Sequence, residues 1–253
     1  VAWFAAMMTG LKFSFTGHAK DIYLESLNPA GLLERKMNAA EFVVTCTKAN
    51  QTHLEAISTT KVHCLYHGLS TDFTDLLETE KGISGERNGK LRALAVGRLV
   101  QKKGLDVFVD ACSILQKRNV DFEAVIVGEK GDASKIVEQK IAENGLRGKI
   151  HLMGSMPQSG VFEELRKATM FCLPCRILEN GDRDGIPNVM MEAMSCGLPV
   201  VTTNVSGIPE IIKNGENGIM VNPEDANALA DAMQKVHEDK LFAKRLSEAA
   251  KVT

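Results

Sequence analysis

From residue 91 onward, short apolar runs alternate with segments in which apolar residues recur every three or four positions. The runs predict strands and the segments predict helices. The predicted strands are 91–96, 123–127, 150–153, 170–173, 199–202 and 218–221. The predicted helices are 105–117, 136–144, 161–167, 188–196, 209–213 and 226–237. This alternation is typical of a doubly wound parallel α/β sheet.

The first third of the chain shows a shorter version of the same pattern. Strands are predicted at 12–15, 42–46 and 61–65, and helices at 32–40 and 48–57. A polar stretch rich in glycine and glutamate, from Asp72 to Lys90, separates the two regions and is typical of a linker. We therefore predict a partial Rossmann-like domain over 1–75, a linker over 76–90 and a complete Rossmann-like domain over 91–253.

Composition and charge narrow the class of protein. The 253 residues are 44% hydrophobic and 25% charged, which is typical of a globular chain. The 30 basic and 32 acidic side chains leave a net charge of −2, so no overall basic field attracts nucleic acid. The apolar start, Val1–Leu11, is shorter than the roughly 18–20 residues of a membrane helix and has no basic leader before it. It suggests instead that upstream sequence is missing.

The cysteines indicate the compartment and bear on metal binding. Six are scattered through a chain that needs no disulfide framework, which is typical of a reducing cytoplasm. Cys172 and Cys175 form a C-x-x-C pair, but no second pair stands at metal-ligand spacing, so we expect both to be buried structural residues. We therefore predict a cytoplasmic protein without a metal site.

A basic loop follows the strand predicted at 91–96. Gly97 leaves room for a ligand against the backbone, and Arg98 and Lys103 follow it. Open α/β sheets bind ligands at this carboxyl edge. The planar fork of Arg98 suits phosphate oxygens, and Lys103 adds a point charge. The spacing alone is equally consistent with a solvated basic turn.

Two carboxylates, Asp184 and Glu192, lie eight residues apart around a Gly-Ile-Pro turn that opens the helix predicted at 188–196. Unpaired amides at the start of a helix can hold phosphate or sugar oxygens. A carboxylate further along the helix suits the two hydroxyls of a ribose. The alternative is that Asp184 is a helix cap and Glu192 an exposed helix residue.

Together these motifs resemble those of a known family. The chain contains G-R-L-x(3)-K-G, the two carboxylates, E-A-M-x-C-G-x-P-V-V, Val205–Glu210 and Asn214–Gly218 in that order, with upstream matches at Phe13–Tyr23 and Tyr66–Phe73. The set resembles the GT-B fold retaining glycosyltransferases of family 4 (group 1), in particular bacterial exopolysaccharide and colanic-acid-type enzymes. Since a GT-B enzyme has two complete Rossmann-like domains, the resemblance implies a fragment that lacks most of its amino-terminal, acceptor-binding domain.

The resemblance implies a role for each matched residue. Gly97, Arg98 and Lys103 would hold the donor diphosphate, Glu192 the ribose hydroxyls, and Asp184 with the amides of Gly185 and Ile186 the donor sugar. His18 matches a histidine that lies near the transferred sugar, so His18 and Asp184 are the candidate catalytic residues. Many relatives carry Glu in place of Asp184, so its reach to the sugar is one methylene shorter. The sequence 128–131 departs from the family's usual base-binding loop and leaves the base open.

The implied function is a hexosyltransferase that moves a sugar from a UDP-, GDP- or ADP-sugar to a saccharide or lipid-linked acceptor in polysaccharide biosynthesis. Neither a metal nor a cofactor is expected, and no nucleic-acid partner. Association with the inner face of the membrane would come through the missing amino-terminal domain. The alternatives are a non-catalytic nucleotide-sugar-binding fragment and another GT-B enzyme, such as a sugar-nucleotide epimerase or a glycogen-type phosphorylase. A dehydrogenase is disfavoured because no G-x-G-x-x-G follows a strand.

Overall fold

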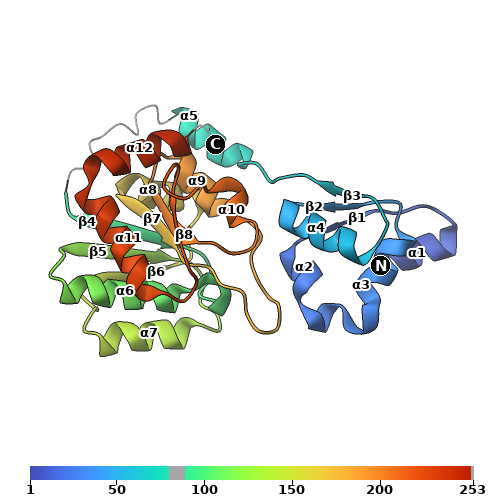
Figure 1. The fold of residues 1–253 in the computed structure, drawn as a ribbon, viewed down its shortest axis with the longest axis horizontal. Coiled ribbons are helices and arrows are strands. Elements are labelled where there is room, and N and C mark those ends of the chain that lie inside the picture. Colours follow the sequence, from blue (N-terminus) through green and yellow to red (C-terminus); the bar gives the residue numbers. More distant parts are fainter. Residues whose placement is uncertain (80–88, 252–253) are drawn as a thin grey trace. The chain divides into compact units, whose positions relative to one another are not determined.

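A computed structural model describes residues 1–79 and 89–251 (Figure 1). Contacts divide the chain into two units. The smaller unit contains Val1–Gly68, Ile177–Ile186 and Ser206–Glu210, and the larger unit contains Leu69–Arg176, Pro187–Val205 and Ile211–Thr253. Two segments from the second half of the chain therefore pack with the first third.

The larger unit is built on a six-stranded sheet in which every neighbouring pair is parallel. Its strands are β4 (Leu91–Val96), β5 (Phe122–Val127), β6 (Ile150–Gly154), β7 (Met170–Leu173), β8 (Val200–Thr203) and β9 (Ile219–Val221). The spatial order is β6-β5-β4-β7-β8-β9. The chain runs outward from β4 in one direction and then, from β7, in the other. Ligands bind such sheets where the order reverses, outside the carboxyl ends of β4 and β7.

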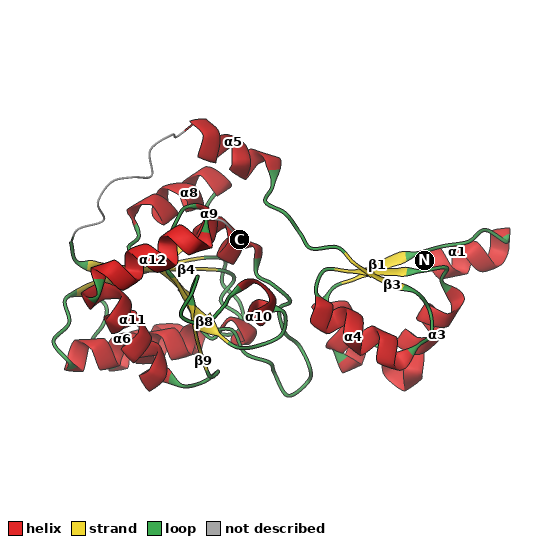
Figure 2. Ribbon diagram, turned by 45° about the horizontal axis from the view of Figure 1, so that its top comes forward, coloured by secondary structure: helices red, strands yellow, loops and turns green. Residues whose placement is uncertain are grey.

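Helices lie on both sides of this sheet, with α6 and α7 below its strands and α8 and α9 above them in Figure 1. Figure 2 shows the same arrangement coloured by element type. The helices are α5 (Thr71–Thr79), α6 (Leu105–Lys117), α7 (Ser134–Glu143), α8 (Gln158–Lys167), α9 (Asn188–Ser195), α11 (Ala226–Glu238) and α12 (Lys240–Ala250). The short helix α10 (Ile208–Ile211) belongs to the smaller unit except for its last residue. Because both faces are covered, strands β7 and β8 are buried throughout, which explains their continuous apolar sequence.

These elements confirm the predicted doubly wound parallel sheet, with every predicted strand and helix present after residue 90 and ends shifted by three residues or fewer. Helix α12 is an addition that the sequence reasoning missed, although its buried Leu246 and Ala250 stand four positions apart. Cys172 and Cys175 are both buried, as predicted.

The smaller unit contains a three-stranded parallel sheet in the order β1 (Phe15–Gly17), β2 (Val43–Thr45) and β3 (Val62–Cys64). The strand predicted at 12–15 therefore starts later, because its pairing with β2 begins at Phe15 opposite Val43. The helices are α1 (Ala2–Thr9), α2 (Ala19–Tyr23), α3 (Leu32–Ala39) and α4 (Lys48–Ile57), with single 3₁₀ turns η1 (Glu25–Leu27) and η2 (Pro29–Gly31).

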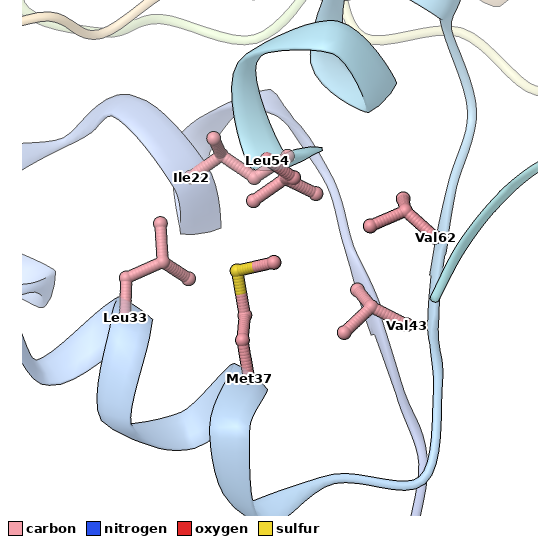
Figure 3. Close-up of a cluster of buried hydrophobic side chains, with 6 residues drawn as sticks. All are labelled: Ile22, Leu33, Met37, Val43, Leu54 and Val62. Carbon is pink, nitrogen blue, oxygen red and sulfur yellow. The ribbon is translucent and has the colours of Figure 1, made fainter. Parts of the chain in front are cut away.

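Helices α2, α3 and α4 cover this small sheet through one apolar cluster (Figure 3). Met37 points from α3 into its middle, and its side chain, like those of Val43 and Leu54, is fully buried. The cluster is completed by Ile22, Leu33 and Val62. Helix α1 has no buried residue, and its Phe4, Met7 and Met8 are exposed.

The predicted linker is partly helical. Helix α5 begins at Thr71 and packs on α8 through an edge-to-face contact between Phe73 and Phe162, with ring centroids 5.5 Å apart. Both rings are buried. Phe73, Leu76 and Leu77 stand at helical spacing within this polar stretch, which is the local signal for the helix. Residues 80–88 of the predicted linker lie outside the described residues, and the predicted domain limits at 75 and 90 stay a prediction.

Candidate functional site

The loop after β4 carries the predicted phosphate-binding cations of the larger unit. It runs from Gly97 through a single 3₁₀ turn, η3 (Gln101–Lys103), to Gly104 at the start of α6. Lys102 is 8% exposed, whereas Lys103 is half-buried and Arg98 is exposed. Successive side chains of a 3₁₀ turn point about 120° apart, so two adjacent lysines receive different environments.

Lys103 lies across Gly97. A β-carbon at Gly97 would stand 3.2 Å from Cε of Lys103, closer than an ordinary contact. The lysine side chain therefore returns over the carboxyl end of β4 and occupies space that a larger residue at position 97 would take. This is the same strand end at which Gly97 was predicted to admit a ligand.

Neighbouring loops approach the β4 loop so closely that only glycine fits at three positions. A β-carbon at Gly128 would stand 1.9 Å from the carbonyl oxygen of Gly97, and one at Gly131 would stand 2.7 Å from that of Leu99. At Gly104 the carbonyl oxygen of Pro174 would be 1.9 Å away. The loops after β4, β5 and β7 are thus packed backbone against backbone at the point where the strand order reverses.

Glu192 lies on α9 and is half-buried. Its Oε1 accepts a hydrogen bond from Nε2 of Gln158 on α8 at 3.3 Å, and the same amide donates to Oγ of Ser70 at 3.0 Å. Burial raises the pKa of Glu192, and the hydrogen bond from Gln158 partly opposes that rise. Glu192 is therefore not an ordinary exposed helix residue. Its carboxylate is partly shielded from water and lies beside the side-chain amide of Gln158.

The segment 177–186, which carries Asp184, belongs to the smaller unit. The guanidinium carbon of Arg183 lies 3.9 Å from the ring centroid of Tyr23 at the end of α2. Gly181 approaches the same residue so closely that a β-carbon there would stand 2.2 Å from the carbonyl oxygen of Tyr23. Asp184 is not the cap of α9, because the cap position is Pro187.

Gly185 and Ile186 end this segment beside the turn that starts α4. A β-carbon at Gly185 would contact Cγ2 of Thr47 at 3.4 Å. Segment Ser206–Glu210, the second later segment of the smaller unit, meets the same threonine, because a β-carbon at Gly207 would stand 2.6 Å from its Cγ2 and 3.1 Å from Cγ1 of Ile186. Gly185 therefore lies against the residue that precedes α4, and Ile186 lies beside Gly207 at the same place.

Glu210, in the same second segment, is a polar anchor that sequence reasoning missed. Its carboxylate accepts hydrogen bonds from the amides of Lys48 at 2.7 Å and Ala49 at 2.8 Å, and from the hydroxyl of Tyr66 at 2.7 Å. These amides belong to the first turn of α4, where a helix has no partners of its own for them. No local signal pointed to this role, because about 160 residues separate Glu210 from the helix it caps.

His18 lies directly after β1 and begins α2. Its backbone amide donates to Oδ2 of Asp21 at 3.1 Å, and its Nδ1 lies 3.5 Å from the same oxygen. The ring of His67, which follows β3, meets the His18 ring edge to face with centroids 5.3 Å apart. Both histidines follow carboxyl ends of strands in the small parallel sheet, which brings together residues separated by 49 positions.

The predicted site residues thus form two groups. Gly97, Arg98, Lys103 and Glu192 belong to the larger unit, and His18 with 184–186 belongs to the smaller one. Over residues 1–79 and 89–251, no cluster of three or more His, Cys, Asp or Glu side chains could hold a metal ion. No helix in the described part of the chain is long and apolar enough to cross a membrane.

Comparison with solved structures defines the class of fold. The structure of HepE from Anabaena with UDP and glucose matches 99% of this chain and 68% of its own, with a TM-score of 0.79 and 20% sequence identity. Sucrose-phosphate synthase from Thermosynechococcus elongatus matches 99% of this chain and 65% of its own, with a TM-score of 0.79 and 18% identity. The predicted GT-B fold is confirmed by these neighbours.

Sequence comparison then gives the family. Residues 78–253 match the family model described as glycosyl transferases group 1, and the chain belongs to this family. The amylovoran biosynthesis glycosyltransferase AmsK of Erwinia amylovora is 40% identical over 148 residues, 58% of this chain and 36% of AmsK. The putative colanic acid biosynthesis glycosyltransferase WcaL of Escherichia coli K12 is 37% identical over 143 residues, 56% of this chain and 35% of WcaL. The matched stretch is about a third of each relative's length.

A first prediction concerns the packing of Gly104. Gly104 and Gly145 both have a φ of +65°, but a β-carbon at Gly145 meets nothing within 4 Å. Gly145→Ala should cost about 1 kcal/mol for the left-handed backbone alone. Gly104→Ala should cost about 1–3 kcal/mol more, because the new methyl meets the carbonyl of Pro174. Urea denaturation of both variants measures the difference, and equal losses would contradict the packing described here.

A second prediction concerns the ionisation of Glu192. Its folded-state pKa is raised above 4.5, so the folded state holds the proton more tightly, and the wild type loses stability as pH rises through the window above pH 4.5. Glu192→Gln cannot ionise. The Tm of Glu192→Gln minus that of the wild type should therefore become more positive from about pH 4.5 to pH 7.

The matched control is Glu248→Gln on α12, where the side chain is 68% exposed. Thermal melts of this variant should show no such trend with pH. A Tm difference for Glu192→Gln that stays constant across the same pH range would refute the burial of a charged Glu192.

Proposed function

We propose that the protein is a retaining glycosyltransferase and that this chain binds its nucleotide-sugar donor. The enzyme transfers a hexose to a saccharide or lipid-linked acceptor in exopolysaccharide synthesis. The observation that carries the proposal is the cationic, glycine-packed loop at the reversal point of the large sheet. The family supports group transfer, and the names of AmsK and WcaL support an exopolysaccharide product. Acceptor class, association with the membrane and a cytoplasmic location stay predictions.

The donor diphosphate is assigned to Arg98 and Lys103. Both follow the carboxyl end of β4, where parallel sheets of this order bind ligands. Arg98 is exposed and offers a planar fork for phosphate oxygens, and Lys103 lies over Gly97 at the strand end. These two cations would neutralise the negative charge that grows on the leaving diphosphate, so they lower the barrier electrostatically.

The ribose is assigned to Glu192. Its carboxylate accepts a hydrogen bond from the side chain of Gln158 at 3.3 Å, and a carboxylate has enough lone pairs to accept two ribose hydroxyls as well. Its desolvation makes an unoccupied site costly, and hydroxyl donors would offset that cost. Gln158 contacts Oε1 of the carboxylate, so in this proposal Oε2 is the oxygen that meets the ribose.

The transferred sugar is assigned to Asp184, to the amides of Gly185 and Ile186, and to His18. All four belong to the smaller unit, where Arg183 and Gly181 dock the segment on Tyr23. His18 acts by orienting the donor rather than by transferring a proton, and Asp21 holds its imidazole. Asp184 contacts the sugar with a side chain one methylene shorter than the glutamate of many relatives.

Retention of configuration follows if the acceptor oxygen attacks the face that the diphosphate leaves. The sugar then passes through an oxocarbenium-like state, with the leaving diphosphate oxygen and the attacking acceptor oxygen on the same face. UDP is the first nucleotide to test, because HepE was solved with UDP and glucose and with UDP-glucose.

A third prediction tests this function directly. Radiolabelled UDP-, GDP- and ADP-hexoses are offered with saccharide and lipid-linked acceptors, and one donor class should give labelled product. Arg98→Ala should lower turnover roughly a hundredfold or more, because it removes one of the two protein cations that would stabilise the negative charge on the leaving diphosphate. The control is Arg147→Ala, an exposed arginine just before β6 at the opposite edge of the sheet, which should keep wild-type turnover.

Two outcomes would decide against the proposal. Near-normal turnover in Arg98→Ala removes the diphosphate assignment. Tight nucleotide binding without product from any donor favours the second candidate, a nucleotide-sugar-binding module without transfer activity, for which the site of the larger unit would suffice.

A fourth prediction concerns metal ions. If Arg98 and Lys103 neutralise the diphosphate, nucleotide affinity should be the same in excess EDTA and in millimolar Mg²⁺. Isothermal titration calorimetry in the two buffers makes the comparison. A large loss of affinity in EDTA would show that a divalent cation neutralises part of the negative charge of the diphosphate.

A further inference from the structure

Arg176 is a largely buried charged residue at the reversal point of the large sheet, three residues after the end of β7. Its side chain is only 15% exposed. The guanidinium Nε donates to the carbonyl of Gln101 at 2.8 Å, Nη2 pairs with Oδ1 of Asp106 at 2.7 Å, and Nη1 lies 3.3 Å from Oε1 of Glu224. Every nitrogen of the guanidinium therefore has a partner within the larger unit.

These partners lie on three different segments. Gln101 is in η3, Asp106 is in the first turn of α6, and Glu224 is in the loop between β9 and α11. The backbone amide of Arg176 also donates to the carbonyl of Lys102 at 2.9 Å. One residue thus holds two successive carbonyls of η3, the turn that ends in Lys103.

The pair with Asp106 is the strong part of this arrangement. The side chain of Asp106 is 14% exposed, so both charges are largely removed from water and each depends on the other. Glu224 is 68% exposed, and an ion pair with a solvated carboxylate contributes little. Because two carboxylates neutralise Arg176, its guanidinium is occupied and is not itself available to a phosphate.

We propose that Arg176 is a positioning residue for the diphosphate subsite: it holds η3 so that the side chain of Lys103 lies over Gly97 at the end of β4. The inference rests on the proposed function. The fork geometry of arginine is essential, because a planar guanidinium fixes the direction of the bond to the carbonyl of Gln101 while it pairs with Asp106. A lysine keeps the ion pair but loses the fixed second bond.

The test compares a nucleoside diphosphate with its nucleoside. The wild-type chain is titrated with UDP, GDP and ADP by calorimetry, and the diphosphate that binds is then paired with uridine, guanosine or adenosine. Arg176→Met should lower the affinity for the diphosphate by roughly a hundredfold, the order of loss for a misplaced catalytic group. It should leave the affinity for the nucleoside within about twofold of the wild-type value. Arg176→Lys should show most of the same selective loss.

Arg92 supplies the matched control. It lies near the amino end of β4, its side chain is 20% exposed, and it pairs with Glu164 at 2.9 Å and Glu123 at 3.6 Å. Arg92→Met removes a similar two-carboxylate network at the opposite edge of the same sheet. It should lower Tm as Arg176→Met does, yet leave affinity for both diphosphate and nucleoside unchanged at 20 °C or below.

The outcomes separate this inference from the proposed function. If no nucleoside diphosphate binds the wild type more tightly than its nucleoside, the diphosphate assignment itself has failed. If the wild type binds the diphosphate and Arg98→Ala weakens it, but Arg176→Met behaves like Arg92→Met, the positioning role is refuted. Full recovery of affinity in Arg176→Lys would also refute it, since charge alone would then be sufficient.

Discussion

The close approach of three loops at the carboxyl edge of the six-stranded sheet is the constraint on which the candidate site depends. Gly128 faces the carbonyl of Gly97, and Gly104 faces that of Pro174, at separations that no β-carbon tolerates. Packed interiors transmit small displacements because they contain few voids. We therefore expect a change in any one of these loops to alter the position of the cations after β4.

The charged side chains near the end of β4 differ in how far they are buried. Lys102 is buried, Lys103 lies over the strand end and Arg98 faces solvent. Arg176 is neutralised by carboxylates, so its own charge is not offered to an anion. Glu192 is a partly buried acid, and burial of its charged form costs folding free energy. Hydrogen bonds from ligand hydroxyls would offset that cost. Such a conflict between stability and polarity is typical of functional sites.

The smaller unit shows how little of its organisation is local. Its apolar cluster closes around Met37, but two later segments complete its polar contacts. Glu210 caps α4, and Arg183 lies over Tyr23, so the segment that carries Asp184 is held by residues from the first third of the chain. Contact between His18 and His67 follows from the same parallel sheet.

The sequence by itself determined the alternation of strands and helices, the parallel sheet and the two candidate motifs, because burial on both faces and helical periodicity leave local patterns. It missed α5, although Phe73, Leu76 and Leu77 held that signal, and it began β1 too early, since pairing with Val43 sets the first residue. Only the tertiary structure distinguished Lys102 from Lys103, excluded Asp184 as a cap of α9 and gave Arg176 and Glu210 their partners. The physical reason is that hydrogen bonds and desolvation depend on distances between residues remote in the chain, and no local pattern records those distances.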